Sequence, residues 1–356
     1  MDRPLVRKIP NVAVFLSVYG LSHALIDASC VFLLLGAIDV REQLLFYIVL
    51  YNALAFGLQV PFGFYLDKYV YPRSVSIIGL LCVCVAYFVI TVPLLAVVLI
   101  GVGNALFHVG GGKVALEIDY RKACYAGIFV APGGIGLALG IYLSMVYNPW
   151  FLLIFPIGLL VMSIALFFTK LPEKMPVEKT QQKVNYALVI IVLLMLSIAI
   201  RSVIGLTISF PWKSHVPLLI LFTLAIALGK SIGGILADKF GWMNIGFGGL
   251  LVSIPLLLFG FTIPSLGIIG ICLFNFTMPI TLVAISNVLP NRAGFSFGLT
   301  TLALFLGALP TFTKYKTWFT QDWIVVSFIV LASIAFYFAL KIMKKQNVTN
   351  NILEEQ

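Results

Sequence analysis

The stretch GFYLDKYVYPR, residues 63–73, ends an apolar run that begins near Leu44, and it places Asp67 and Lys68 where that run stops. The stretch GILADKFGWMN, residues 234–244, ends another apolar run with the same Asp-Lys pair. The two corners lie 171 residues apart, close to half of the 356-residue chain. A solvated turn capped by an Asp side chain would explain either copy alone. Two copies in register indicate an internal repeat.

The composition of the chain predicts an all-α membrane protein. Only 10% of the residues are charged and 61% are hydrophobic, whereas globular chains carry about 25% charged residues. The apolar stretches recur at lengths of about 20 residues, which is enough for a helix to cross a hydrocarbon core of about 30 Å. The lipid bilayer is therefore the expected surrounding of the chain.

Glycine, proline and charge clusters divide the sequence into twelve candidate spans. They are 11–37, 43–66, 74–92, 94–116, 124–147, 150–169, 186–210, 216–237, 244–263, 265–289, 293–313 and 322–342. These spans predict an N-terminal six-helix bundle over 1–169, a linker over 170–185, a C-terminal six-helix bundle over 186–342 and a tail over 343–356.

The distribution of basic residues orients the predicted spans. With both termini on one side, the connections on that side carry sixteen Lys and Arg residues, and those on the other side carry four. The positive-inside rule therefore places both termini and the linker in the cytoplasm of a cell-membrane protein. The net charge of +10 consequently reflects membrane topology, and nucleic acid is not an expected partner.

Shifting the chain against itself by 171 residues aligns several further residues. The aligned pairs are Gly63 with Gly234, Asp67 with Asp238, Lys68 with Lys239, Asn104 with Asn275, Arg121 with Arg292, and Gly127 with Gly298. One offset kept through four successive spans predicts two six-helix repeats in parallel orientation, an arrangement known from transporters.

The two Asp-Lys corners resemble the signature loops of the major facilitator superfamily, which follow its second and eighth helices. The resemblance covers the span count, the linker, the orientation and both loops, and it implies the major facilitator fold. It also implies that Gly63, Asp67 and Lys68, with Gly234, Asp238 and Lys239, form a cytoplasmic gate in which each Asp caps a helix end and pairs with a basic residue. The first copy departs from the family pattern at Val70, where glycine is usual.

Ionisable side chains inside the spans are candidates for function, because burying them in a membrane is costly. His23 and Asp27 lie four residues apart in the first span and share one helix face. Arg201 lies at a corresponding depth in the seventh span, which the family fold places across a central cavity. The alternatives are an Asp27–Arg201 pair across that cavity and local partners for each residue within its own half.

The fourth span adds Asn104 and His108 to the candidate cavity residues, again four residues apart, and it also holds Lys113. The segments around His23, His108 and Arg201, together with LPNRAGFSFGL before the eleventh span, resemble the fosmidomycin-resistance branch of drug exporters. The chain departs from that branch after His108, where it reads HVGGGK.

These features predict a secondary transporter, with proton-coupled export of a small organic molecule as the main hypothesis. His23 and Asp27 would carry or gate the proton, and Arg201 would act as counter-charge. Proton-coupled import of a small metabolite is the alternative, and Arg201 would suit an anionic one. The expected partners are the substrate and the proton, and a monomer is expected.

The sequence does not favour an enzyme or a nucleotide-driven pump. His-Glu-x2-His and Gly-x4-Gly-Lys-Ser/Thr are absent from the chain. The three histidines are scattered along the sequence, so neither a metal site nor a cofactor is expected.

Overall fold

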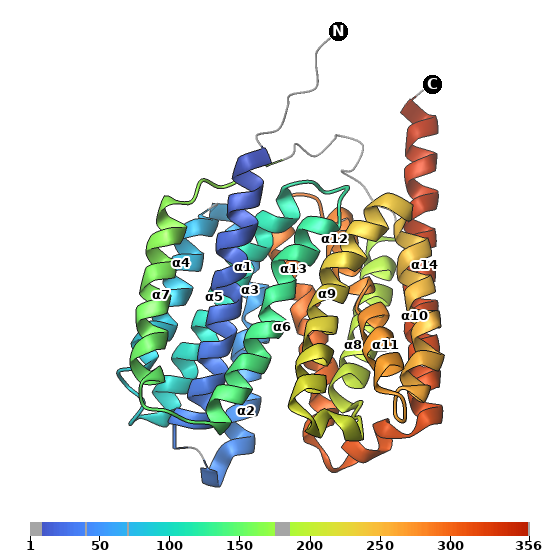
Figure 1. Ribbon diagram of the computed structural model, residues 1–356. Helices are drawn as coiled ribbons and strands as arrows, with labels where there is room; N and C mark the ends of the chain where they lie inside the picture. The colour runs from blue at the N-terminus through green and yellow to red at the C-terminus, as the bar shows by residue number, and fades with distance from the viewer. Residues whose placement is uncertain (1–8, 40, 70, 175–185, 355–356) are drawn as a thin grey trace.

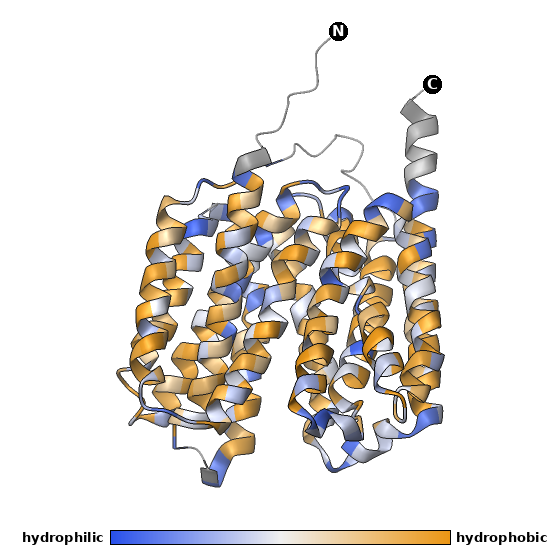
Figure 2. Ribbon diagram, in the orientation of Figure 1, coloured by the Kyte–Doolittle hydropathy of each residue, from blue (hydrophilic) through white to orange (hydrophobic). Residues whose placement is uncertain are grey.

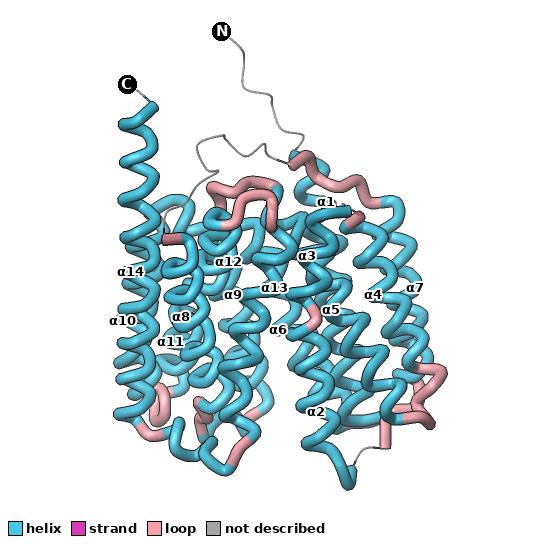
Figure 3. The backbone as a smooth tube through the Cα atoms, turned by 180° about the vertical axis from the view of Figure 1, so that it is seen from behind, coloured by secondary structure: helices cyan, strands magenta, loops and turns pink. Residues whose placement is uncertain are grey.

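The computed structural model describes residues 9–39, 41–69, 71–174 and 186–354, and the regular structure in these ranges is helical. Helices α1 to α7 form one group and helices α8 to α14 form another beside it (Figure 1). The start of α1 and the end of α14 lie at the same end of the molecule, which we call the terminal end. Seen from behind, the loops gather at the two ends of the helices (Figure 3). The predicted all-α class is confirmed.

The first group contains seven α-helices, and the π-helical turns η1 (Leu33–Ala37) and η3 (Ala53–Gly57) continue α1 and α2. The helices are α1 (Ile9–Phe32), α2 (Leu44–Asn52), α3 (Gln59–Tyr69), α4 (Pro72–Ala86), α5 (Pro93–Glu117), α6 (Cys124–Met145) and α7 (Phe151–Phe168).

The second group also contains seven α-helices, with short 3-10 turns at 211–214, 309–312 and 314–320. The helices are α8 (Ala187–Thr207), α9 (Val216–Phe240), α10 (Trp242–Phe259), α11 (Pro264–Phe274), α12 (Thr277–Val288), α13 (Ala293–Ala308) and α14 (Asp322–Glu354).

Eleven membrane-length apolar helices are found among the described residues, against twelve predicted spans. The difference lies in the predicted span 74–92, because α4 ends at Ala86 and is a shorter apolar helix. Pro93 keeps Val92 out of the helical region, since the residue before a proline is sterically pushed out of it, and Val92 has φ −114° and ψ 83°. The twelve-span, two-repeat arrangement therefore stays a prediction.

Two predicted boundaries also differ or fall outside the description. Helix α14 continues past residue 342 to Glu354, because the polar sequence there contains neither glycine nor proline to stop it. Of the predicted linker, residues 175–185 lie outside the described residues, and so does Val70 of the first corner. In the second corner, Gly241 ends α9 with φ 95°, a backbone conformation that favours glycine.

The outer surface of both groups is apolar, as expected for helices that face lipid. Figure 2 shows hydrophobic residues along the helices and polar residues gathered toward their ends. Large apolar side chains are exposed on this surface, and Phe88 and Met145 are each 77% exposed. An apolar surface of this extent is typical of a membrane interface. The structure therefore supports a multi-pass membrane protein.

Glycines allow close helix contacts within and between the two groups. A Cβ atom at Gly136 of α6 would lie 2.7 Å from the Cα of Ala24 in α1. Between the groups, a Cβ atom at Gly63 of α3 would lie 2.7 Å from the backbone nitrogen of Phe295 in α13. Because small residues let membrane helices approach closely, these positions set the spacing of α1 against α6 and of α3 against α13.

The α1–α6 contact generates a stability prediction. Gly136→Ala should lower the melting temperature of the detergent-solubilised protein, because overpacking a tight contact costs about 1–3 kcal/mol. Gly205→Ala in α8 is the matched control, since a Cβ atom there meets nothing within 4 Å. Equal melting temperatures for the two variants would contradict the assigned contact.

Candidate functional site

Asp67, near the end of α3, caps the N-terminus of α13 in the other group of helices. The Gly294 N–H donates to Asp67 Oδ1 at 2.9 Å, and the Phe295 N–H donates to Oδ2 at 2.8 Å. Lys113 of α5 donates from Nζ to Oδ1 at 2.8 Å, and the Asp67 side chain is only 1% exposed. A carboxylate is stabilised here because the first N–H groups of a helix lack intrahelical partners and carry partial positive charge.

Asp238, near the end of α9, makes the reciprocal contact with the first group of helices. The Ala123 N–H donates to Asp238 Oδ1 at 2.7 Å, and the Cys124 N–H at the start of α6 donates to Oδ2 at 2.9 Å. The Trp242 indole N–H donates to Oδ1 at 3.2 Å. Each group of helices thus supplies one carboxylate to a helix start of the other group, and together these contacts join the halves at the terminal end.

The basic partner of Asp67 is Lys113, a residue to which the sequence analysis gave no role. Lys113 Nζ also donates to Glu117 Oε1 at 2.8 Å, and Lys174 Nζ reaches the same oxygen at 2.7 Å. Lys68, the lysine next to Asp67 in the motif, has its Nζ 5.1 Å from the centre of the Tyr69 ring. The spacing of Lys113 and Glu117, four residues apart on one helix, is the signal that could have indicated a partnered lysine.

The second motif lysine is placed like the first, and the two motif glycines pack between the groups. Lys239 Nζ lies 5.1 Å from the centre of the Phe240 ring. Gly63 packs against the α13 start, and a Cβ atom at Gly234 would lie 2.8 Å from the Ala123 carbonyl oxygen. The glycines therefore let each Asp corner reach the helix that its carboxylate caps.

A second cluster, formed by His23, Asp27 and His108, lies in the first group of helices; we call it the His-Asp-His cluster. His23 Nε2 lies 3.4 Å from Asp27 Oδ2, and His108 Nε2 lies 3.6 Å from Asp27 Oδ1. The two imidazole rings meet edge to face with their centroids 4.4 Å apart. Asn104 completes the cluster, because its Nδ2 donates to Asp27 Oδ1 at 2.8 Å.

The cluster is nearly buried, with one side less covered than the other. The His23 side chain is 5% exposed, whereas His108 is 12% and Asp27 is 18% exposed. Gly133 of α6 faces the cluster, and a Cβ atom there would lie 2.7 Å from Asp27 Oδ2. The absence of a side chain at Gly133 therefore lets the α6 backbone pack directly against His23 and Asp27.

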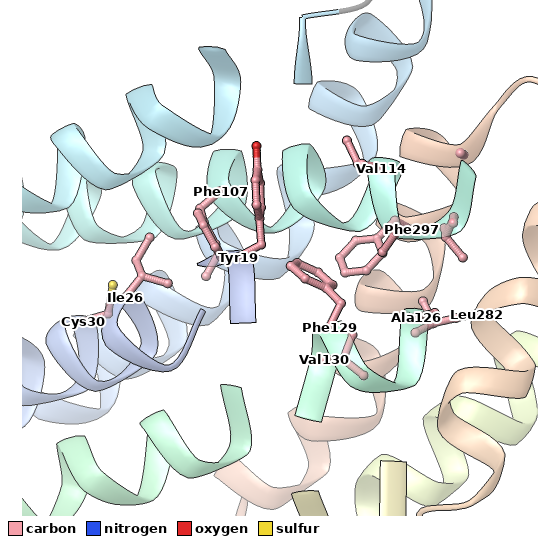
Figure 4. Close-up of a cluster of buried hydrophobic side chains, with 14 of the residues drawn as sticks. Tyr19, Ile26, Cys30, Phe107, Val114, Ala126, Phe129, Val130, Leu282 and Phe297 are labelled. Atoms are coloured by element: carbon pink, nitrogen blue, oxygen red, sulfur yellow. The ribbon is translucent and has the colours of Figure 1, made fainter. Parts of the chain in front are cut away.

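Aromatic side chains separate the His-Asp-His cluster from the contacts at the terminal end. Figure 4 shows Phe129 of α6 and Phe297 of α13 facing each other beside Phe107 and Tyr19. The Phe129 ring lies 5.0 Å from the His23 ring and 6.2 Å from the Phe297 ring, centroid to centroid. Phe297 of the second group thus packs against Phe129 in the core of the first, and Phe129 packs against His23.

Arg201 of α8 lies apart from Asp27 in this conformation. Its side chain is buried, and its Nη2 donates to Thr281 Oγ1 of α12 at 3.3 Å. Its Nε has no hydrogen-bond partner. Helix α8 packs on α12, α13 and α14, whereas α1 packs on α5, α6 and α7. The Asp27–Arg201 ion pair raised in the sequence analysis is consequently not formed among the described residues.

A cation of the second group, Lys230 on α9, approaches the helix that covers the cluster. Lys230 Nζ lies 3.7 Å from the Cβ position of Gly134, the residue after Gly133. Gly133 in turn faces Asp27, so Lys230 and Asp27 both approach this part of α6. The sequence does not indicate this position of Lys230, because nothing in it shows that α9 packs on α6.

The contacts at the terminal end predict an order of effects for two substitutions. Asp67→Asn should open this end more than Asp238→Asn, because breaking a buried ion pair costs about 3–5 kcal/mol and losing a helix cap costs about 0.5–2 kcal/mol. The measure is the rate at which a membrane-impermeant maleimide, applied from the terminal side, labels Cys124. The other four cysteines are first replaced by alanine.

Glu173→Gln provides the control for this labelling, since Glu173 is an exposed acidic residue near the same end. Its labelling rate should equal that of the parent protein. Parental labelling rates in both Asp variants would leave only the interpretation of two solvated turns.

Comparison with known proteins places the fold. No family model and no curated protein matches the sequence. The structure matches the E. coli fucose:proton symporter FucP, with TM-score 0.67 and 11% identity over 95% of this chain and 98% of that one. It matches the human organic anion transporter MFSD10 with TM-score 0.68 and 16% identity over 95% of this chain and 100% of that one. It also matches a bacterial homologue of the iron transporter ferroportin in an outward-facing state, with TM-score 0.60 and 14% identity over 95% of this chain and 99% of that one. The chain has the fold of major facilitator superfamily transporters.

Proposed function

We propose that the protein is a secondary active transporter that exports a small organic molecule in exchange for protons across the cell membrane. The observation that carries this proposal is the pair of carboxylate caps. These caps join the two halves through contacts that a rocking motion can break. Transporters of this kind alternate access to one central site by moving one half against the other. A monomer with both termini in the cytoplasm is part of the proposal.

The orientation sets which state the structure represents. With the termini in the cytoplasm, as the basic residues favour, the Asp67 and Asp238 caps close the cytoplasmic end. The conformation then faces outward. Opening the caps on the cytoplasmic side would expose the cavity residues to substrate inside the cell.

Proton coupling is assigned to Asp27 with His23. Asp27 is a carboxylate in the interior of a membrane protein, and such residues commonly serve proton relays. Its surroundings include Lys230 from the opposite half, so movement of the halves changes the distance between the two charges. A carboxylate binds a proton more readily when a cation withdraws and releases it when the cation returns. The branch resemblance around His23 and His108 supports export as the direction.

Import of an anionic metabolite is the second candidate, and Arg201 favours it. Its buried guanidinium lacks an acidic partner among the described residues, and its Nε has no hydrogen-bond partner. Buried cations are normally paired, so a carboxylate or phosphate of a substrate is a suitable partner. MFSD10 is an organic anion transporter and FucP a sugar:proton symporter, so both substrate type and direction need a direct test.

The transport test uses inside-out membrane vesicles with an acidic lumen and a panel of labelled organic compounds. Wild-type protein should accumulate at least one compound only while the pH gradient is present. Asp27→Asn should abolish this accumulation and spare exchange of the same compound at equal pH. Glu173→Gln should retain accumulation. Wild-type accumulation by Asp27→Asn would remove Asp27 from the coupling mechanism.

Arg201 provides a separate prediction about substrate charge. Arg201→Ala should abolish transport of an anionic compound. Lysine keeps the positive charge of arginine but loses its bidentate geometry. Arg201→Lys should therefore restore part of the transport if the charge alone matters. The measurement is the initial uptake rate as a function of compound concentration. Unchanged uptake by Arg201→Ala would assign Arg201 a packing role.

A further inference from the structure

We propose that His23, Asp27 and His108 form a binding site for one divalent first-row transition-metal ion. This goes beyond the proposed transport function, and it rests on neither the direction of transport nor the proton. One donor atom from each residue lies within 4.8 Å of the other two. The set of two imidazoles and one carboxylate comes from two helices, α1 and α5, that pack against each other.

The distances in the cluster fit a bridging ion better than direct hydrogen bonds. The Nε2–Oδ distances of 3.4 and 3.6 Å exceed the range of about 2.7–3.2 Å for N–H···O hydrogen bonds. A tetrahedral ion with metal–ligand distances of about 2.0–2.1 Å places neighbouring ligand atoms about 3.4 Å apart. The two distances involve different oxygens of the Asp27 carboxylate, so each histidine–carboxylate pair has the spacing of two ligands of one ion.

The outer nitrogens of both rings are fixed in the way metal-binding histidines require. His23 Nδ1 lies 2.8 Å from the Phe129 carbonyl oxygen, and His108 Nδ1 lies 2.8 Å from the Asn104 carbonyl oxygen. A carbonyl only accepts, so each Nδ1 carries the proton. In a neutral ring Nε2 then presents its lone pair to Asp27. Histidine ligands in metal sites are oriented by such contacts.

With both rings neutral, these lone pairs and the carboxylate face one another, an arrangement that a bound cation stabilises. Asn104 Nδ2 holds the carboxylate in place through its 2.8 Å bond to Oδ1, and Gly133 adds no side chain on that side. Three protein ligands leave a fourth position of a tetrahedral ion open. Imidazole donors favour zinc, iron or cobalt over Mg²⁺ and Ca²⁺, which prefer oxygen ligands.

The test is equilibrium binding of Co²⁺ and Zn²⁺ to the full-length chain in detergent, purified without a polyhistidine tag. We expect one ion per chain, with the visible absorption bands of tetrahedral Co²⁺ that Zn²⁺ abolishes and Mg²⁺ does not. Asp27→Asn and His108→Ala should weaken binding by more than about 100-fold, and Asn104→Ala by about 10–100-fold, as for other groups that orient ligands.

His215→Ala is the matched control, because His215 is the one histidine of the chain outside the cluster and is exposed at the start of α9. It should bind Co²⁺ like the wild type. Monodispersity and melting temperature show that each variant is folded. Equal binding by wild type and Asp27→Asn, or loss of binding in His215→Ala, overturns the proposal. Binding is measured without a gradient, so its failure is distinct from failure of transport.

Discussion

The fold depends on two carboxylates that cap helices across the boundary between its halves. Asp67 binds the start of α13 and Asp238 binds the start of α6. Each half therefore supplies a carboxylate that caps a helix of the other half. Each contact joins a carboxylate with a full negative charge to N–H groups that lack partners within their own helix. Other hydrogen-bond partners for these groups are few, because most of the neighbouring side chains are apolar. Glycines at the same corners bring the backbones close enough for these bonds.

The helices that receive these contacts also carry the His-Asp-His cluster. Helix α5 bears His108 and, five residues further, Lys113, which binds Asp67. Helix α6 starts at the Asp238 cap and carries the Phe129 carbonyl that orients His23. Two continuous helices therefore connect the contacts at the terminal end to the cluster. In the transport function proposed above, this connection would couple opening of the terminal end to the cluster.

The sequence predicted the helical class, the duplicated corners and the polar residues inside the spans. Periodicity and charge placement carry that information, because each depends on residues close together in the chain. Contacts between distant helices were not accessible in the same way. Lys113 as the partner of Asp67 and the meeting of His23 with His108 required the packing of α1, α3 and α5. The expected Asp27–Arg201 pair came from repeat symmetry, which does not specify the conformational state.

The central claim is that the carboxylate caps hold the terminal end closed, and a distance distribution tests it most directly. Spin labels at Tyr71 in the first half and Phe240 in the second, both exposed, would be measured by pulsed electron resonance in lipid. The account predicts one short distance in the wild type and an added longer population in the Asp67→Asn/Asp238→Asn double variant. An identical distribution in both proteins would contradict it.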